Sequence, residues 1–178
     1  MRKKLILLCC YVFLFKVSEA AVIKNPEVSF SAVGSPSFLK ITGEATKLDF
    51  YVTTEKDGKK YEVFEFPLKE LSTGIDLRDE HMKEKFLDVK EYPSALLKIQ
   101  MKDKSNLVFD DQKTLEGILT LHGQSKKVSI EAKKRKNKIQ AEYEIKLSDF
   151  GIKIPEWAGI TVADKVTIQA SFDLNIQL

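Results

Sequence analysis

The stretch that decides the fold is the C-terminal run Lys165–Leu178, KVTIQASFDLNIQL. From Val166 onward every second residue is apolar, and the residues between are polar. Successive side chains of a β-strand point to opposite faces of a sheet, so this alternation is typical of a strand with one buried and one solvated face. The run therefore predicts a long strand that borders an apolar core.

The same period of two recurs through most of the chain, which predicts eight or nine strands. The apolar positions of the other runs are Val28/Phe30/Ala32, Leu39/Ile41, Leu48/Phe50/Val52, Phe64/Phe66/Leu68, Ala95/Leu97/Ile99/Met101, Leu115/Gly117/Leu119/Leu121, Val128/Ile130/Ala132 and Ile139/Ala141/Tyr143/Ile145/Leu147. We find no linker, low-complexity tract or internal repeat between them. A single all-β domain is expected.

The connections between these runs are short and have the composition of tight turns. Lys56-Asp57-Gly58-Lys59 is a strong hairpin signal, Gly123-Gln124-Ser125 forms a second turn, and Asn137 lies in a third. Strands joined this closely must be antiparallel, because a parallel pair needs a long crossover.

One segment, Asp76–Leu87, breaks the alternation and is rich in helix-forming residues. We expect a short helical crossover with Asp76 as its N-cap. Its apolar side would carry Leu77, Met82, Phe86 and Leu87. Tyr92-Pro93 would then lead into the next strand.

Residues 1–20 have the layout of a secretory signal peptide. Arg2, Lys3 and Lys4 precede the apolar stretch Leu5–Phe15, and Ser18 and Ala20 are small residues at the −3 and −1 positions of a cleavage site. The apolar stretch is too short to span a bilayer, which takes about 20 residues. We therefore assign 1–20 to a signal peptide and 21–178 to the mature domain, located in the periplasm or secreted.

Removal of the signal peptide would also change the cysteine content and the net charge of the protein. Cys9 and Cys10 are the two cysteines of the chain, so the mature domain has no disulfide and no thiolate metal site. The chain has 29 basic and 26 acidic residues, but the leader takes four basic and one acidic residue with it. A mature domain without net charge gives no reason to expect nucleic acid as a partner. We interpret the basic run Lys133–Lys138 as a solvated hairpin tip, with anionic lipid contact as the alternative.

A sheet of eight strands with one apolar face can close into a barrel or fold into a sandwich, and composition does not choose between them. A membrane barrel is the third arrangement to weigh. Its polar face would have to pack many lysines and glutamates into a narrow lumen, which is costly. We expect a domain that does not span a membrane.

Several motifs, in order, resemble the YceI-like family over essentially the whole mature chain. They are Thr73-Gly74-Ile75, Arg78-Asp79-Glu80-His81-Met82, Phe86-Leu87-Asp88-Val89, Tyr92-Pro93, Gly117–Gly123 with Lys127-Val128, Ser148–Ile152 and Val162–Val166. The resemblance implies a single antiparallel eight-stranded lipocalin-like barrel with a short helical crossover. It also implies an apolar tunnel for a polyisoprenoid or fatty-acid-like lipid, and the homodimer that family members often form.

This sequence departs from the family pattern at two places, and both bear on the identity of the ligand. The opening strand reads Pro26–Phe30 where the family usually has an Asp-x-x-His/Asn-Ser stretch, and Ile154–Trp157 is inserted in a proline-aromatic loop. The fold implied by the resemblance is compatible with both, but the identity of the ligand does not carry over.

The residues that invite a catalytic or metal interpretation are few. His81 and His122 are far apart in sequence, and no His-x-His or His-x-x-x-His pair exists to bind zinc. We interpret Arg78, Asp79 and His81 as residues that fix the crossover against the barrel, and His122 as a surface or hydrogen-bonded residue. No catalytic residue, metal site or cofactor other than a bound lipid is expected, and the protein is not expected to be an enzyme.

The large apolar side chains of the strands and the crossover indicate the function. We expect the ligand to be lined by residues from the dry faces and the crossover, namely Phe30, Phe50, Phe64, Phe66, Met82, Phe86, Leu97, Ile99, Leu119, Tyr143, Ile145, Ile168 and Phe172. The first hypothesis is a carrier or store of a polyisoprenoid or quinone-type lipid. Its rivals are a carrier of fatty acids or fatty amides, which a polar group at the closed end of the tunnel would favour, and a filled barrel acting as a structural or interaction module.

The first prediction concerns processing. Exported protein should begin at Ala21, because Ser18 and Ala20 fit the small pockets of a signal peptidase. N-terminal sequencing checks this. Retention of residues 1–20, or a lipid attached to Cys9 or Cys10, would contradict it.

Overall fold

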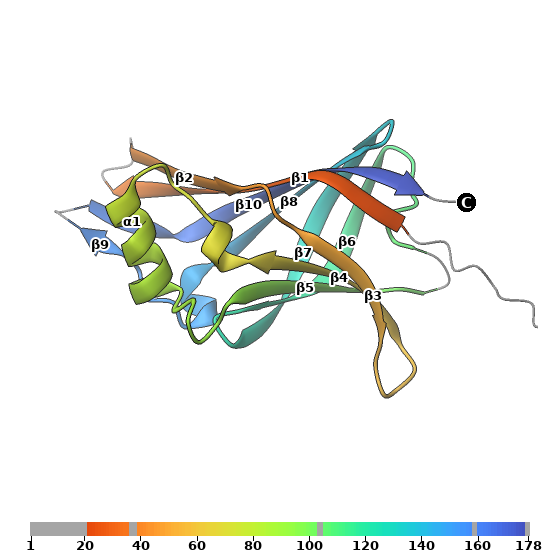
Figure 1. Ribbon diagram of the computed structural model, residues 1–178, viewed down its shortest axis with the longest axis horizontal. Helices are drawn as coiled ribbons and strands as arrows, with labels where there is room; N and C mark the ends of the chain where they lie inside the picture. Colours follow the sequence, from red (N-terminus) through yellow and green to blue (C-terminus); the bar gives the residue numbers. More distant parts are fainter. Residues whose placement is uncertain (1–20, 36–38, 103–104, 158–159, 177–178) are drawn as a thin grey trace, which may run out of the picture.

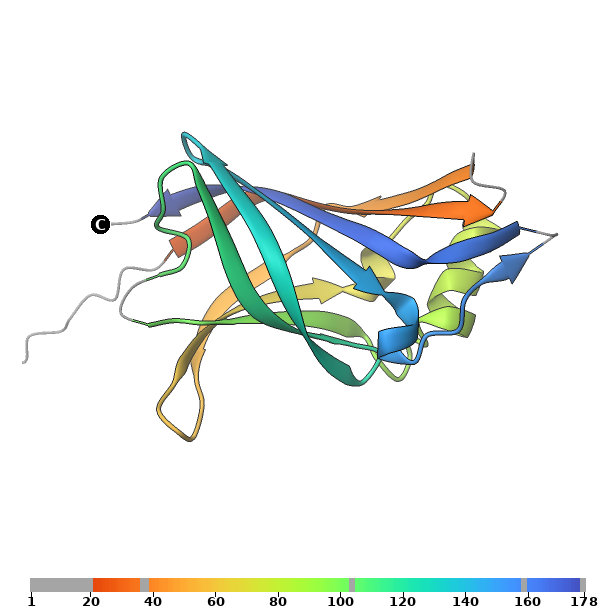
Figure 2. The same cartoon turned by 180° about the vertical axis from the view of Figure 1, so that it is seen from behind.

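The computed structural model describes residues 21–35, 39–102, 105–157 and 160–176. The expected signal peptide lies outside these residues. Figure 1 shows the arrangement of the described elements, and Figure 2 shows it from behind. In chain order they are β1 (Ala21–Ser35), β2 (Leu39–Ala45), β3 (Asp49–Thr54), β4 (Lys60–Pro67), η1 (Leu68–Glu70), α1 (Asp76–His81), η2 (Met82–Phe86), β5 (Ser94–Gln100), β6 (Gln112–Leu121), β7 (Gln124–Arg135), β8 (Lys138–Lys146), η3 (Leu147–Phe150), β9 (Glu156–Trp157) and β10 (Ile160–Ile176).

The strands form one curled antiparallel sheet, in the order β2-β1-β10-β8-β7-β6-β5-β4-β3. This confirms the expected all-β, antiparallel, lipocalin-like class. Among the described residues the sheet has nine strands along this path, one more than the eight of the expected barrel, and the short β9 pairs with β10. Its two edge strands, β2 and β3, are not paired with each other in that order, so the sheet is a half-barrel (Figure 2).

The C-terminal strand is central to the sheet because it pairs on both sides. Ile168 of β10 lies opposite Phe30 of β1 and opposite Tyr143 of β8. The strand begins at Ile160, five residues before the alternating run in the sequence. Alternate residues of β10 face the interior, where Val166, Phe172 and Leu174 are buried.

The pairing of β1 with β10 is interrupted between Lys24 and Glu27. Pro26 lies in this interruption, and proline cannot donate the backbone N–H that a regular ladder needs. Pairing resumes at Glu27, which places Val28 and Phe30 on the inner side.

Two of the three turns predicted from the sequence are observed where they were expected. Gly58 has φ 80° in the β3–β4 turn, and its N–H donates to the carbonyl of Glu55 over 2.9 Å. Lys136 has φ 57° in the two-residue turn between β7 and β8. The β6–β7 turn is His122-Gly123 and not Gly123–Ser125, because Gln124 already pairs with Leu121. Both turn residues have positive φ, which glycine adopts at little cost.

The helical crossover covers Asp76–Phe86, close to the expected Asp76–Leu87, but it changes type within the segment. α1 ends at His81, and η2 continues it as a π-helical turn. Asp76 does not cap the helix: the N-cap position is Ile75, and no side chain caps it. Leu87 is buried and Met82 and Phe86 are half-buried, whereas Leu77 is 53% exposed.

Asp79, and not Asp76, connects the crossover to the preceding loop. Its carboxylate accepts hydrogen bonds from Ser72 Oγ at 2.8 Å, from the Thr73 backbone N–H at 2.7 Å and from Thr73 Oγ1. Arg78 adds bonds in the other direction, from Nε to Thr73 Oγ1 at 2.8 Å and from Nη2 to Thr73 O at 2.7 Å. Ser72 is itself bridged to Glu44 of β2, so these contacts hold the crossover against the sheet edge.

Burial is the strongest single influence on Asp79 and raises its pKa, but the hydrogen bonds from Thr73 and Ser72 and the charge of Lys83 together lower the pKa below its usual value. The ionised carboxylate is therefore favoured in the folded state. Its contribution to stability is present above the pKa of the unfolded chain and is lost as pH falls through the lower folded pKa.

Asp79→Ala should lower the melting temperature by about 3 °C near neutral pH, as about 1 kcal/mol does in a domain of this size. Asp76→Ala is the matched control, since Asp76 lies on the same helix, is exposed and gives no side-chain cap. The difference between wild type and Asp79→Ala should begin to shrink below about pH 4, the ordinary range of a carboxyl in the unfolded chain, and should be lost as pH falls through the lower pKa of the folded state. Calorimetry across pH checks both points, and equal effects of the two variants would rule out the anchoring role.

Candidate functional site: an apolar cavity inside the half-barrel

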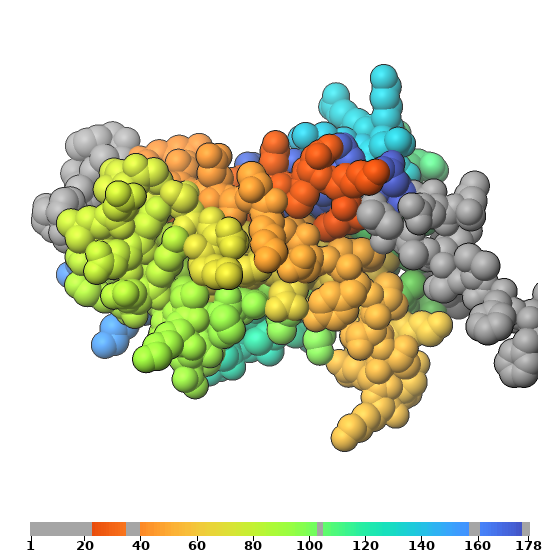
Figure 3. All heavy atoms as spheres, viewed as in Figure 1, coloured from red at the N-terminus to blue at the C-terminus, as the bar shows by residue number. Residues whose placement is uncertain are grey.

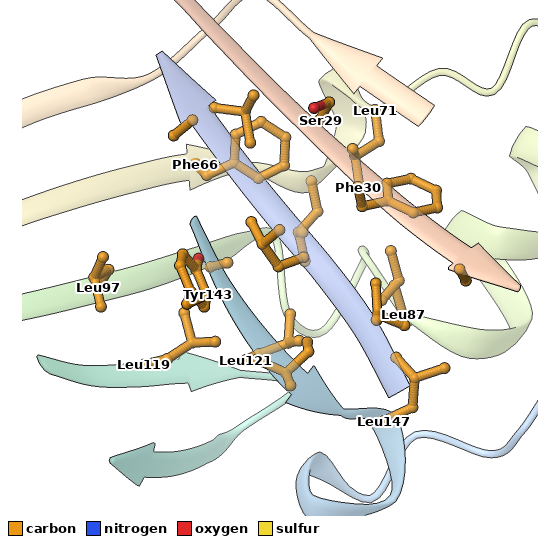
Figure 4. A pocket seen from close by; sticks show the side chains of 18 of the residues that line it. Ser29, Phe30, Phe66, Leu71, Leu87, Leu97, Leu119, Leu121, Tyr143 and Leu147 are labelled. Carbon is orange, nitrogen blue, oxygen red and sulfur yellow. The ribbon is translucent and has the colours of Figure 1, made fainter. Parts of the chain in front are cut away.

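The inner face of the sheet encloses a cavity of about 580 Å³. The wall combines side chains of β1, β4–β8 and β10 with those of the crossover. Figure 4 shows Phe30, Phe66, Leu97, Leu119 and Tyr143 arranged around this space. Small-molecule sites in proteins are typically clefts of about 300–1,000 Å³ with mostly apolar walls. The size and lining of the cavity both fall in that class.

Most residues predicted from the dry faces lie on the wall. These are Phe30, Phe64, Phe66, Met82, Phe86, Leu97, Ile99, Leu119, Tyr143, Ile145, Ile168 and Phe172. Phe50 does not line the cavity. It belongs to the edge strand β3, opposite Phe64, and its ring packs against the Phe64 ring with 5.0 Å between centroids. Phe50 therefore packs beside Phe64 on the same face of the sheet and extends the apolar core towards the edge strand.

Several wall residues lie outside that set. Leu68 and Leu71 come from η1 and the residue after it, Leu87 follows η2, and Leu107 and Phe109 belong to the β5–β6 connection. Leu107 is only 3% exposed. Leu68 continues the alternating run of Phe64 and Phe66. The other four positions extend no period-two run, so alternation alone gave no signal for them.

The position of Phe30 depends on a glycine in the neighbouring strand. Phe30 pairs with Gly43 of β2, and a Cβ atom on Gly43 would lie only 2.3 Å from Cε1 of the Phe30 ring. The ring therefore lies directly on the glycine backbone. This contact fixes one side of the cavity wall.

The cavity opens at the end that carries α1. Among the residues described on its wall, the exposed ones are Lys40, Ile75, Leu77, Lys85 and Glu156, from β2, the crossover and β9. Figure 1 places these elements together at one end of the molecule, and Figure 3 shows the yellow-green atoms of the crossover covering that end. We call the opening that these five residues surround the mouth.

The inward side of the crossover is mixed in character. Arg78, His81, Met82, Lys85 and Phe86 all border the cavity, at the three- and four-residue spacing of one helix face. Lys85 Nζ lies 3.1 Å from His81 Nε2. His81 thus contacts the crossover itself. The hydrogen bonds with the preceding loop are instead those that Arg78 donates and Asp79 accepts.

The opposite end is closed by the β5–β6 connection, which a buried carboxylate holds. Glu62 is 0% exposed and shares the inward face of β4 with Phe64 and Phe66. It accepts hydrogen bonds from Ser105 Oγ at 2.5 Å and from the Asn106 backbone N–H at 3.1 Å. Leu107, the next residue, is thereby placed on the cavity wall.

His122 is in neither the mouth nor the wall. Its Nδ1 donates to the carbonyl of Phe150 over 3.1 Å, and its ring packs against Tyr92 with centroids 4.7 Å apart. Within the described ranges no three His, Cys, Asp or Glu side chains are grouped to hold a metal ion. In the same residues no helix is long and apolar enough to cross a membrane.

A curled antiparallel sheet around one large apolar cavity defines a lipocalin-like binding fold. The comparisons with known proteins identify its family. The YceI-like domain matches residues 22–174, so the chain belongs to the YceI-like family. No curated protein matches it.

Solved structures share this fold at low sequence identity. BcnA of Burkholderia cenocepacia is 18% identical, with a TM-score of 0.62, over 84% of this chain and 96% of that one. A polyisoprenoid binding domain from Saccharophagus degradans is 13% identical, with a TM-score of 0.64, over 90% and 100%. The YCEI protein of Campylobacter jejuni is 18% identical, with a TM-score of 0.53, over 78% and 85%. At these identities the likeness shows the fold alone.

Glu62→Ala should loosen the closed end, because Ser105 and the Asn106 N–H would lose their buried acceptor, at a cost of about 1–3 kcal/mol. Amide hydrogen exchange should rise at Asn106 and Leu107 in particular. Glu65→Ala is the control: Glu65 lies on the same strand and accepts only the exposed Tyr51 hydroxyl. Unchanged protection at Asn106 in the Glu62 variant would show that the carboxylate does not hold the connection.

Proposed function

We propose that this protein is an exported carrier or store of one long apolar ligand, a polyisoprenoid or quinone-type lipid, and has no catalytic activity. The observation that carries the proposal is the cavity of about 580 Å³ inside the half-barrel. Membership of the YceI-like family and the fold shared with a polyisoprenoid binding domain support it. The signal-peptide layout of residues 1–20 supports export.

A cavity of this size favours a bound ligand over a structural module, because a structural core is normally close-packed by its own side chains. A structural module would gain by filling this interior with larger side chains, whereas a carrier needs the space.

The volume also limits the size of the ligand. At about 30 Å³ for each water-sized group, the cavity holds roughly twenty such groups. This suits a chain of about four isoprenoid units, or a longer chain whose remainder leaves through the mouth. Burial of each methylene contributes about 0.8 kcal/mol, so the apolar wall alone provides tight binding.

A carrier of fatty acids or fatty amides is the second candidate, and one observation favours it. Lys40, Arg78 and Lys85 border the cavity at the mouth, where Glu156 is the one acidic side chain among the described wall residues. An excess of positive charge beside the opening would attract a carboxylate headgroup. Extraction of the bound lipid decides between the two.

Ile99→Trp should reduce the lipid that co-purifies with the exported protein, because Ile99 is 4% exposed and lies on the wall. A larger ring in a close-packed core costs about 1–3 kcal/mol, but here it can enter the cavity, so the melting temperature should change little. Ile145→Asn should have the same effect on binding through an unfavourable polar contact. Native mass spectrometry and analysis of the organic extract measure the bound lipid.

Ile118→Trp is the matched control, since Ile118 is 40% exposed and absent from the wall. It should retain wild-type amounts of lipid. Wild-type protein that carries no lipid and takes up no added prenyl or fatty chain would eliminate the carrier function.

A further inference from the structure

Tyr143 carries the one polar side-chain group that the structure places deep in the cavity wall. It lies on the inner face of β8 between Ala141 and Ile145, opposite Ile168 of β10. Figure 4 shows Tyr143 among the apolar side chains that line the cavity, with Leu119 nearby. Tyr143 lies three residues, about 10 Å, from the end of β8 nearest the crossover.

The Tyr143 hydroxyl has no hydrogen-bond partner among the described residues. Every fully enclosed nitrogen or oxygen of those side chains has a partner. Tyr143 is half-buried and lines the cavity, so its oxygen is reachable from the cavity and is not one of these enclosed atoms. A tyrosine hydroxyl on an apolar wall gains from a hydrogen-bond partner.

A single ordered water would be a poor hydrogen-bond partner for the Tyr143 hydroxyl. A buried water needs two to four polar neighbours, and Tyr143 offers one. The other polar side chains on the described wall belong to the mouth or to its neighbours Thr73, Arg78 and His81, apart from Ser29, which lies in the outward register of β1 between Val28 and Phe30. The wall around the Tyr143 hydroxyl is therefore apolar, and a polar atom of a bound ligand would complement the hydroxyl.

Tyr143 is a neutral hydrogen-bond donor at every physiological pH. Burial raises the pKa of its phenol well above the usual value. A neutral phenol donates to a carbonyl, ether or hydroxyl oxygen and gives no charge with which to hold an anion.

We propose that the Tyr143 hydroxyl donates a hydrogen bond to a neutral oxygen of the bound lipid, and so selects oxygenated chains that bind with their oxygen-bearing end inside the barrel. This inference rests on the proposed carrier function and adds the chemical class and the orientation of the ligand. The hydrocarbon tail then lies towards the mouth. A pure hydrocarbon of the same length leaves the hydroxyl without a partner and binds more weakly.

The test uses three probes that share one C20 isoprenoid skeleton: geranylgeraniol, its methyl ether and the corresponding hydrocarbon. The ether can only accept a hydrogen bond, so it isolates donation by Tyr143. Their affinities for the mature protein and for Tyr143→Phe are measured by displacement of a fluorescent apolar dye. Tyr92→Phe is the control, because Tyr92 is absent from the cavity wall.

We expect the alcohol and the ether to bind wild type roughly three- to tenfold more tightly than the hydrocarbon, which corresponds to one hydrogen bond. Tyr143→Phe should remove this preference and leave affinity for the hydrocarbon unchanged or higher. The ligand-free variant should melt no lower than wild type, since it loses only an unpartnered hydroxyl.

The inference is overturned if wild type binds all three probes equally, or if Tyr143→Phe weakens all three by the same factor. Binding of none of the probes would overturn the carrier function and the inference together. These results are distinguishable because only the last one lacks binding to wild type.

Discussion

The pairing of β10 with β1 on one side and β8 on the other is the constraint on which the interior depends. Ile168 lies opposite Phe30 and Tyr143, and all three side chains border the cavity. Because side chains alternate along a strand, a shift of one residue in either register would exchange the apolar side chains of β10 for its polar ones. The bulge at Pro26 and the short turns hold that register.

Two carboxylates stabilise the ends of an otherwise apolar interior. At the mouth, Asp79 accepts hydrogen bonds from the loop that precedes the crossover, and at the closed end Glu62 accepts them from the β5–β6 connection. Each carboxylate orders a segment outside the regular strands; the loop at the mouth has in addition one isolated bridge, from Ser72 to Glu44. Both carboxylates therefore lie at the ends of the sheet. Because their hydrogen bonds order the loops there, the cavity wall between them can consist mainly of apolar side chains.

The sequence predicts the strands well because one face of the sheet is buried. Apolar and polar residues therefore alternate along each strand, and this alternation is visible in the sequence. It places the β6–β7 turn one residue late, because Gln124 and Ser125 are polar yet already paired in β7. Asp76 is the expected cap by residue type, but Asp79 reaches the loop instead, a choice that depends on the path of the backbone. Glu62 does interrupt the apolar positions of its strand, which is a signal in retrospect. Its partners, 43 and 44 residues away, could not be read from the pattern.

The cavity could be expected from the family resemblance but not from composition. Whether large side chains fill an interior depends on how tightly the sheet curls, and the open edge between β2 and β3 is a property of the whole fold. Side chains that line a cavity lack packed protein neighbours on one side, so this part of the molecule should be more compressible than a close-packed core. A lipid in the cavity would supply those neighbours, and the loaded protein should then be the less compressible of the two forms.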